Sequence, residues 1–391
     1  MFAVLPKARN LLLRLGALAA ALWLASCDTG AIGGTGPRIN TDVPVPVALL
    51  VPGGGGNSGD EFLARGLRQA AEMAIADLQG VTIDLRVYNT GGDPAQAAAV
   101  ATQAVNEGAK IILGPVFAEA ANAVGRAVAP AGVNVLSFSN NTDIAGGNVF
   151  VLGPTFPNTA NRLVSYAARV GKKRILMVNE QTAAGEAGAR AITGAIARNG
   201  ALPAGNFSYP FSQEGVINAI PAIAARAKSG EVDAIFMTAD TSGALSYLTQ
   251  LLPEQGVDRA IVQFIGLTRW DIPPSTLALP GVQGGWFALP DPGLNGQFAA
   301  RYQAAFGEPP HPISGLAYDG IAAIGALVQA GKADALTSAA LTQGAGFVGV
   351  NGIFRLLADG TNERGLAVAE VRNNQVIVID PAPRSFGGAG F

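Results

Sequence analysis

The sequence predicts an α/β protein of two lobes, each a doubly wound parallel sheet with helices on both faces. Short apolar runs alternate with Ala-rich segments of helical spacing through residues 45–141, and the pattern returns through residues 149–266. The 391 residues exceed what one ordinary core covers. Hydrophobic residues make up 49% and charged residues 14%, and after residue 27 the apolar blocks are too short to cross a membrane. Such blocks are typical of buried parallel strands.

The clearest unit of this pattern lies in residues 109–141. Apolar runs at 111–113 and 133–136 frame a helical segment at 119–129, which Pro130 and Gly132 end. The carboxyl ends of neighbouring parallel strands border one crevice, where ligands of such sheets bind. The loops after these two runs therefore predict a binding site. Its candidate residues are Val116, Phe117 and Ala118 from the first loop, and Ser137, Ser139 and Asn141 from the second. The two serines could instead satisfy backbone groups at the strand ends.

The preceding segment adds a glycine-rich loop to the same crevice. Strands are expected at residues 47–51 and 81–88, with helices at 60–78 and 95–107. Residues 54–59 fit the spacing of a dinucleotide-binding fingerprint, but Asn89 stands where that motif needs an acidic residue. We expect a flexible lid or rim with Asn57 and Ser58 as hydrogen-bond donors; a plain loop remains the alternative.

The second half of the pattern supplies matching loops. Strands are expected at residues 175–178, 233–238 and 261–266, helices at 185–198, 215–228 and 244–252, and an edge strand at 207–211. The loops after the first two strands carry Gln181 and Asp240, which become candidates for the second side of the crevice. A carboxylate such as Asp240 can pair with an ammonium group.

After residue 280 the pattern changes. A strand is expected at 284–290, helices at 297–306 and 316–329, and two antiparallel strands at 348–357 and 366–378 around an Asp359-Gly360 turn. Tyr318 could reach the crevice or pack in the core, and Asp319 is expected to cap its helix or face the helix dipole. His311 is the only histidine and has no metal-ligand or nucleophile partner in the sequence. We therefore expect no enzyme, metal or cofactor.

The N-terminus predicts export. Lys7, Arg9 and Arg14 precede an apolar core at residues 15–24 and the sequence Leu-Ala-Ser-Cys. Residues 1–27 resemble a bacterial lipoprotein signal, which implies cleavage before Cys27 and a lipid on that cysteine, the only one in the chain. An ordinary signal peptide with a chance cysteine is the alternative. Residues 28–45, rich in Gly, Thr and Pro, predict a flexible tether.

Charge excludes one class of partner. The net charge is −2 and no basic run occurs, whereas nucleic-acid binding needs clustered Lys and Arg. We expect contact with a membrane through the lipid anchor only.

Several short motifs, in this order, resemble type I periplasmic binding proteins of the leucine/isoleucine/valine-binding branch. They are Asp93-Pro94 before an Ala-rich helix, Ile112-Leu113-Gly114-Pro115, Leu136-Ser137, Ala317-Tyr318-Asp319-Gly320 and Gly349-Val350-Asn351-Gly352. The resemblance implies two lobes joined by three crossing strands, near residues 149–154, 287–292 and 344–349. Lobe I would comprise residues 46–150 and 288–345, lobe II 151–287 and 346–381, and residues 382–391 a tail.

The resemblance also implies a function. A small polar solute, such as an amino acid, would be clamped between the lobes for an ABC importer, in the periplasm. In amino-acid binders of this branch a serine holds the ligand carboxylate where this chain has Ala118, and a tyrosine stands where it has Ala184. Asp240 would pair with the ammonium group. The chain is also similar to lipid-anchored activators of penicillin-binding proteins, which regulate peptidoglycan synthesis through protein contact.

Overall fold

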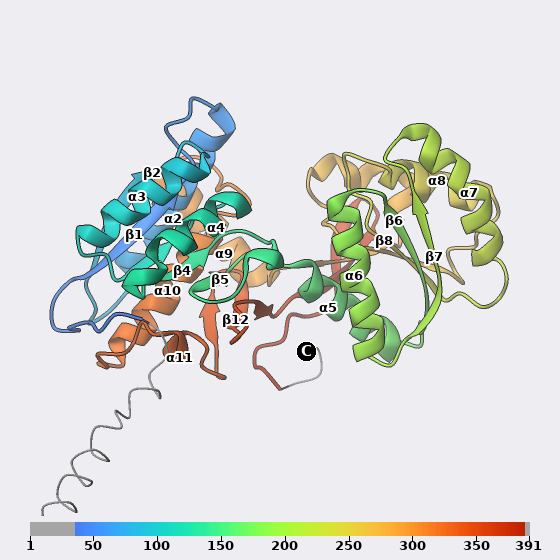
Figure 1. Ribbon diagram of the computed structural model, residues 1–391. Coiled ribbons are helices and arrows are strands. Elements are labelled where there is room, and N and C mark those ends of the chain that lie inside the picture. Colours follow the sequence, from blue (N-terminus) through green and yellow to red (C-terminus); the bar gives the residue numbers. More distant parts are fainter. Residues whose placement is uncertain (1–35, 388–391) are drawn as a thin grey trace, which may run out of the picture.

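The computed structural model describes residues 36–387, which form two α/β lobes (Figure 1). The predicted fold class is confirmed. The expected signal segment, Cys27, residues 28–35 of the tether and residues 388–391 of the tail lie outside the described residues. Within residues 36–387 no helix has both the length and the apolar character that a membrane crossing requires.

Lobe I contains a five-stranded parallel sheet in the order β2-β1-β3-β4-β5. Its strands are β1 (Val45–Val51), β2 (Ile83–Asn89), β3 (Ile111–Leu113), β4 (Asn134–Ser137) and β5 (Val149–Val151). Its helices are α2 (Ser58–Asp77), α3 (Pro94–Asn106), α4 (Ala118–Val128), α9 (Pro292–Phe306), α10 (Gly315–Gln329) and α11 (Ser338–Leu341). The order places the loops after β1, β3 and β4 next to one another.

Alternation along β1 explains why both faces of this sheet are covered. Leu49 points into a core shared with α2, α9 and α10, while Leu50 points into a second core formed with α3 and α4. Both side chains are fully buried. A strand buried on both faces must be apolar throughout, as the sequence of β1 is.

Lobe II contains a seven-stranded sheet in the order β15-β14-β10-β9-β8-β6-β7. Five parallel strands are β6 (Arg174–Glu180), β7 (Leu202–Tyr209), β8 (Ala234–Met237), β9 (Gln263–Gly266) and β10 (Trp286–Leu289). The antiparallel strands are β14 (Ala367–Arg372) and β15 (Gln375–Asp380). Helices α5 (Phe156–Arg169) and α6 (Ala183–Arg198) cover one face, and α7 (Gln213–Ala227) and α8 (Leu245–Glu254) the other.

The C-terminal part differs from the expected pair of long strands. The first expected strand turns back at Val350-Asn351 to give β11 (Phe347–Gly349) and β12 (Gly352–Leu356). The second is divided into β14 and β15, and a further short strand, β13 (Asn362–Arg364), precedes it in the segment expected to form the turn. Asn373 and Asn374, with φ of 52° and 61°, form the turn between β14 and β15. Consecutive left-handed residues favour a two-residue hairpin turn, and Asn tolerates that conformation.

This division also changes where the last segment belongs. Strands β11–β13 form a separate three-stranded sheet, and Phe347, Phe354 and Leu356 pack in the core of lobe I. We expected the chain to cross near residues 344–349, with residues 346–381 in lobe II. Instead the chain leaves β13 and joins the sheet of lobe II only at β14, because the aromatic side chains of β11 and β12 fill the core beside α10.

A buried ion pair fastens this crossing region. Arg364 at the end of β13 donates from Nη1 to Asp319 Oδ2 at 3.1 Å, and from Nε to the carbonyl oxygen of Leu152 at 2.8 Å. Asp319 also accepts from the backbone N of Val350 at 2.7 Å and from the side chain of Asn351 at 3.1 Å. The side chains of Arg364 and Asp319 are 4% and 0% exposed. The network therefore joins the exit of β5, helix α10 and the β11–β12 turn.

The expectation that Asp319 caps a helix or meets its dipole is therefore replaced by a different role. Ser314 occupies the N-terminal cap position of α10, and Asp319 lies inside the helix. The carboxylate is oriented by Arg364, which lies 45 residues later in the chain, and by Val350 in the β11–β12 turn, which lies 31 residues later.

Breaking this pair should destabilise the protein strongly. Arg364→Met leaves the Asp319 carboxylate buried without its cation, which costs about 3–5 kcal/mol of unfolding free energy. Asp319→Asn should cost a similar amount, and the double variant less than the sum of the two. Denaturant-induced unfolding followed by circular dichroism measures these differences.

The pair Arg355–Glu363, on the neighbouring strands β12 and β13, provides the matched control. Its side chains are 29% and 36% exposed, so Glu363→Gln should cost less than about 1 kcal/mol. An Arg364→Met variant as stable as this control would contradict the role of the buried pair.

Candidate binding cleft

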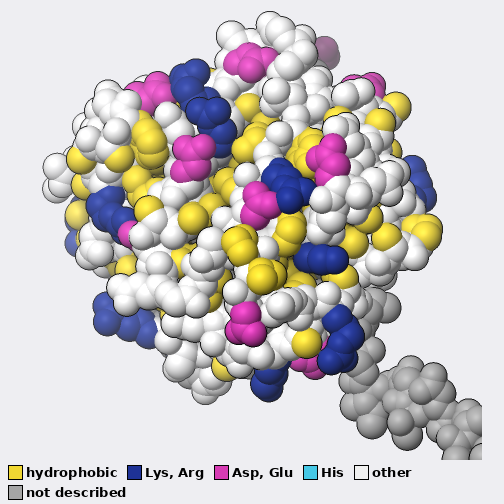
Figure 2. All heavy atoms as spheres, turned by 90° about the vertical axis from the view of Figure 1, so that its left-hand side faces the viewer, with side chains coloured by type: hydrophobic (Ala, Val, Ile, Leu, Met, Phe, Trp, Pro, Cys, Tyr) yellow, Lys and Arg dark blue, Asp and Glu magenta, His cyan; other side chains and the backbone are white. Residues whose placement is uncertain are grey.

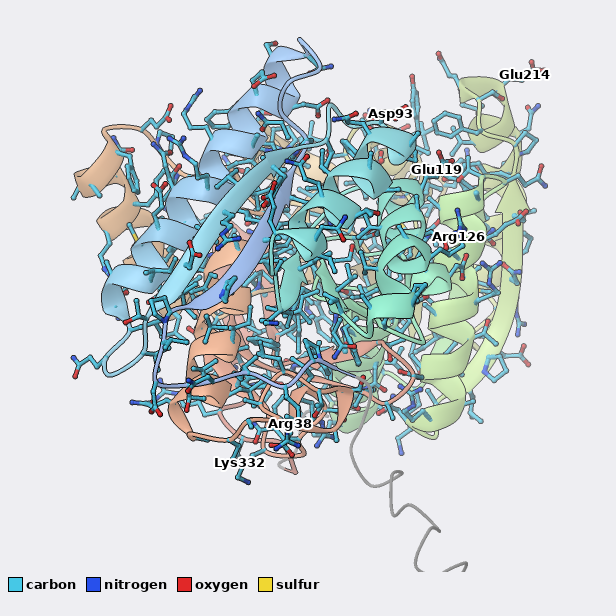
Figure 3. All side chains as sticks on the ribbon, turned by 60° about the vertical axis from the view of Figure 1, so that its left-hand side comes forward. Arg38, Asp93, Glu119, Arg126, Glu214 and Lys332 are labelled. Carbon is cyan, nitrogen blue, oxygen red and sulfur yellow. The ribbon has the colours of Figure 1, made fainter. Side chains whose placement is uncertain are left out.

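The predicted site loops lie at the carboxyl ends of the parallel strands, together with the N-termini of the helices that follow. Figure 3 shows Asp93 and Glu119 at the starts of α3 and α4, whereas Arg38 and Lys332 lie at the opposite end of lobe I. Helix N-termini carry a partial positive charge, which favours acidic side chains there. The outer face of lobe I, seen in Figure 2, mixes acidic, basic and hydrophobic side chains.

The glycine-rich loop is an ordered rim of this region. Asn57 is exposed and caps α2, its Oδ1 accepting from the backbone N of Gly59 at 2.9 Å and of Asp60 at 3.1 Å. The side chain of Glu61 stabilises the loop by accepting a hydrogen bond from the backbone N of Gly54 at 2.6 Å. The oxygen of Asn57 is thus used by the helix, and its amide NH₂ group remains as the donor. Ser58 is the exposed first residue of α2.

The loop after β3 lies against the loop after β2. Phe117 is 39% exposed, and a Cβ atom on Gly92 would come within 3.3 Å of its ring. Val116 and Ala118 are half-buried on either side. An exposed aromatic ring with apolar neighbours gives this rim a surface that can pack on a solute or on another protein.

Both candidate serines form hydrogen bonds with the backbone of the rim loops. The hydroxyl of Ser137 is fully buried, donates to the carbonyl oxygen of Pro115 at 2.9 Å and accepts from the N of Ser139 at 3.1 Å. The Oγ of Ser139 accepts from the N of Asn141 at 3.1 Å. Ser137 therefore supports the loop, while Ser139 still has a hydrogen to donate. Asn141 is exposed and accepts from the N of Asp143 at 2.8 Å.

On lobe II, Gln181 and Asp240 are exposed at the carboxyl ends of β6 and β8. Between them lies Glu180, which the sequence analysis missed. Glu180 is 7% exposed, and its Oε1 accepts a hydrogen bond from the hydroxyl of Tyr209 at 3.3 Å. Burial and the nearby charge of Asp240 raise the pKa of Glu180. Two carboxylates therefore lie close together on this side of the cleft.

Tyr318 does not join the other candidates. Its hydroxyl donates to Asp77 Oδ2 at 2.5 Å, at the C-terminal end of α2, and its ring contacts Phe298. Because α2 begins at the rim with Ser58 and ends at Asp77, this contact lies one helix length away from the predicted site.

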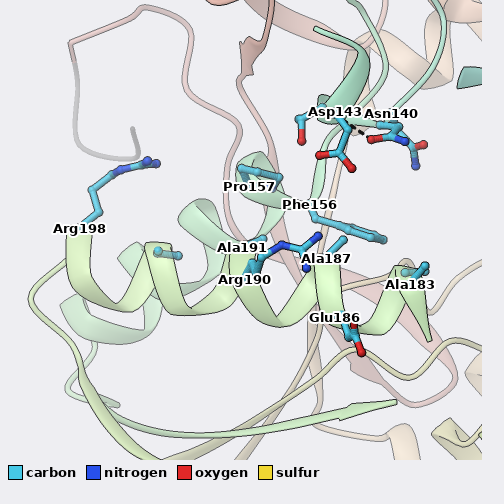
Figure 4. A pocket seen from close by; sticks show the side chains of 15 residues that line it. Asn140, Asp143, Phe156, Pro157, Ala183, Glu186, Ala187, Arg190, Ala191 and Arg198 are labelled. Atoms are coloured by element: carbon cyan, nitrogen blue, oxygen red, sulfur yellow. Dashed lines mark hydrogen bonds between the residues drawn. The ribbon is translucent and has the colours of Figure 1, made fainter. Parts of the chain in front are cut away.

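The lobes border an open cavity of about 660 Å³ between the loop after β4 and one side of α6 (Figure 4). Lobe I contributes residues 140–143, and lobe II contributes Phe156, Pro157 and the α6 residues between Ala183 and Arg198. A second cavity of about 260 Å³ shares Asn140 and Phe156 with the first and extends to Thr268, Arg269 and the crossing residues Asn351 and Arg364. Of the predicted residues, Asn141 lines the larger cavity.

Polar groups of both signs border the larger cavity. Asp143 comes from lobe I, while Arg190, Arg198 and Glu186 come from α6 (Figure 4). None of the ion pairs in the described part of the chain includes these four residues. The cleft thus offers charged groups that no neighbouring side chain neutralises.

The loops that would contact a ligand from the two sides are separate in this structure. No hydrogen bond among residues 36–387 joins Asn57, Phe117 or Ser139 to Gln181 or Asp240, and the lobes meet through the crossing segments (Figure 1). Two α/β lobes with facing loops and a narrow connection are suited to hinge closure. No group of His, Cys, Asp and Glu residues in the described part of the chain is arranged to hold a metal ion.

A profile of periplasmic binding proteins matches residues 44–375, which is most of the chain. The chain belongs to the periplasmic binding protein family. A search of curated proteins gave no match.

Solved structures share the fold of this binding protein. A branched-chain amino acid ABC transporter periplasmic ligand-binding protein from Burkholderia xenovorans has a TM-score of 0.69 and 17% identity, over 88% of this chain and 97% of that one. An ABC transporter substrate-binding protein from Desulfitobacterium hafniense, in complex with Leu, has a TM-score of 0.64 and 17% identity, over 86% and 100%. A solute-binding protein from Rhodopseudomonas palustris, in complex with 3,4-dihydroxybenzoic acid, has a TM-score of 0.59 and 17% identity, over 87% and 96%.

Proposed function

We propose that this periplasmic binding protein captures a small polar solute between its lobes and delivers it to an ABC importer, without catalysing a reaction. The observation that carries the proposal is the cavity of about 660 Å³ that residues of both lobes line. Cavities of 300–1,000 Å³ suit small-molecule ligands. Similar structures with Leu and with 3,4-dihydroxybenzoic acid support capture of a solute while leaving its identity open.

The ligand-binding residues in this proposal come from the rims of both lobes, and of them Asn141 also lines the cavity. Asn57, Ser58, Phe117, Ser139 and Asn141 are contributed by lobe I. Gln181, Asp240 and the newly found Glu180 are contributed by lobe II. Val116, Ala118 and Ser137 shape and support the rim of lobe I, and Tyr318 is left out because it is bonded to Asp77. Asp240 is the candidate partner of an amino group, although its Oδ1 already accepts from the N and the Oγ of Ser242.

The alternative function, activation of a penicillin-binding protein, is supported by one feature. Positions Ala118 and Ala184 lack the polar groups of amino-acid binders, and the rims instead expose Phe117 and Phe211, at 39% and 65%. Exposed aromatic rings are typical of protein-binding surfaces. In this alternative the cleft would contact a protein and need not close on a solute.

A thermal-shift screen of the full-length chain against amino acids, peptides and muropeptides tests the leading proposal. Because a ligand that binds only the folded state stabilises it by mass action, one amino acid or related solute should raise the melting temperature by several degrees at 100 times its dissociation constant. Ser139→Ala and Asp240→Asn should reduce the shift, whereas Glu254→Gln, at the far end of α8, should not.

Absence of any shift, together with copurification of a penicillin-binding protein, would reject the importer role in favour of the alternative.

We also propose that a lipid on Cys27 attaches the protein to a membrane in the periplasm. Cys27→Ser should move the protein from the membrane fraction to the soluble fraction of the cell, as immunoblotting would show. Retention of this variant in the membrane fraction would contradict a lipid at Cys27 as the anchor.

A further inference from the structure

A second, smaller cavity lies within lobe II, beside the two carboxylates. It measures about 250 Å³ and opens between the end of β7, the start of α7 and the start of α8. Three aromatic side chains line it, Tyr209, Phe211 and Tyr247. Tyr209 is 1% exposed, and Phe211 is 65% exposed. The volume lies below the range of pockets that enclose a whole drug-sized ligand, so it suits one group of a solute.

Gly243 connects this cavity to the carboxylates. It lines the cavity, and a Cβ atom on it would lie 3.1 Å from Asp240 Oδ1, 3.1 Å from Glu180 Oε1 and 3.6 Å from the ring of Phe211. Oxygens of both carboxylates therefore lie close to Gly243, at the border of the cavity. Because Gly243 has no side chain, these oxygens can approach its backbone, and a methyl group there would be in tight contact with both of them. The backbone of Gly243 does not have a positive φ, so the conformation itself does not require glycine.

The negative charge at this point has no cationic partner. No ion pair within residues 36–387 includes Glu180 or Asp240. Glu180 is more than nine-tenths buried, and its carboxylate accepts hydrogen bonds from the hydroxyl of Tyr209 and from the backbone N–H of Ala244. Burial and a neighbouring carboxylate disfavour the charged form of Glu180, and a cation beside it would stabilise that form. Burial and the Glu180 charge accordingly raise the pKa of Tyr209.

Aromatic rings next to carboxylates favour one chemical class of ligand, an organic cation with apolar groups around its charge. The faces of aromatic rings attract cations whose charge is spread over apolar groups, and quaternary ammonium ions are the typical ligands of aromatic cages. A bare ammonium would lose strong hydration without enough hydrogen-bond acceptors in the apolar part of the cavity, whereas methyl groups fill that part favourably.

We infer that the cavity lined by Tyr209, Phe211 and Tyr247 is a subsite for a methylated ammonium group, whose charge Glu180 and Asp240 balance. This inference rests on the proposed function, because the cationic group would belong to the solute that the cleft captures. It goes beyond that function by naming the chemical class of the solute.

Isothermal titration calorimetry with the full-length chain tests the inference, with choline as the probe. Choline should bind, and its uncharged isostere 3,3-dimethylbutan-1-ol should bind at least tenfold more weakly. Phe211→Leu should weaken choline binding about tenfold, and Asp240→Asn at least fivefold. Gly243→Ala should weaken choline binding at least fivefold, since its methyl group would come within 3.1 Å of an oxygen of each carboxylate and displace both from the border of the cavity. Glu254→Gln, on the same lobe but outside the cavity, should bind choline as the unmodified chain does.

The outcomes separate the subsite from the proposed function. Equal binding of choline and its uncharged isostere would overturn the subsite, because the cavity would then be merely apolar. Binding of an amino acid in the thermal-shift screen without any choline binding would also overturn the subsite, while the proposed function would stand. If neither choline nor any compound of the screen binds, both fail. The melting temperature of each variant shows whether it is folded; because Phe211 is largely exposed, its substitution provides a test that does not disturb the core.

Discussion

The buried pair between Arg364 and Asp319 is the interaction on which the two-lobed arrangement depends. It lies where the chain passes between the lobes, and its partners come from β5, α10, the β11–β12 turn and β13. Removing two charged groups from water costs desolvation free energy, and only good geometry and further hydrogen bonds offset that cost. The network satisfies this condition, with the carbonyl of Leu152 and the amide of Val350 as additional partners. It holds the connection in a defined geometry without joining the faces of the cleft.

The cleft itself contains polar groups that are only partly used. On lobe I, most oxygens of the loop residues accept from backbone amides, which keeps the rim in place and leaves mainly donors free. On lobe II acceptors predominate, because the carboxylates of Glu180 and Asp240 form no ion pair with any residue in the described range 36–387. A solute with an anionic or acceptor end and a cationic end would fit this polarity, and it would draw the lobes together because each end prefers a different lobe.

Much of the fold could be predicted because the relevant signals are local. The apolar run at residues 111–113 and the Asp93-Pro94 start of α3 need no distant partner to be understood. The division of the last strands was missed, although Asn373-Asn374 was a local signal for a turn. Glu180 looked like an ordinary loop residue; its burial depends on Tyr209, 29 residues later. The prediction of Tyr318 as a ligand-binding residue was wrong because its side chain is oriented by a hydrogen bond to Asp77, 241 residues away in the chain.

The central claim is that the lobes close on a solute, and a distance between them tests it most directly. Spin labels at Gln96→Cys in α3 and Glu214→Cys in α7, in a chain with Cys27→Ser, would report that distance by double electron–electron resonance. Both positions are exposed, near the helix N-termini that border the cleft. The account predicts a shorter distance after addition of the twenty amino acids together with choline. An unchanged distance, while calorimetry shows that a component of the mixture binds, would contradict it.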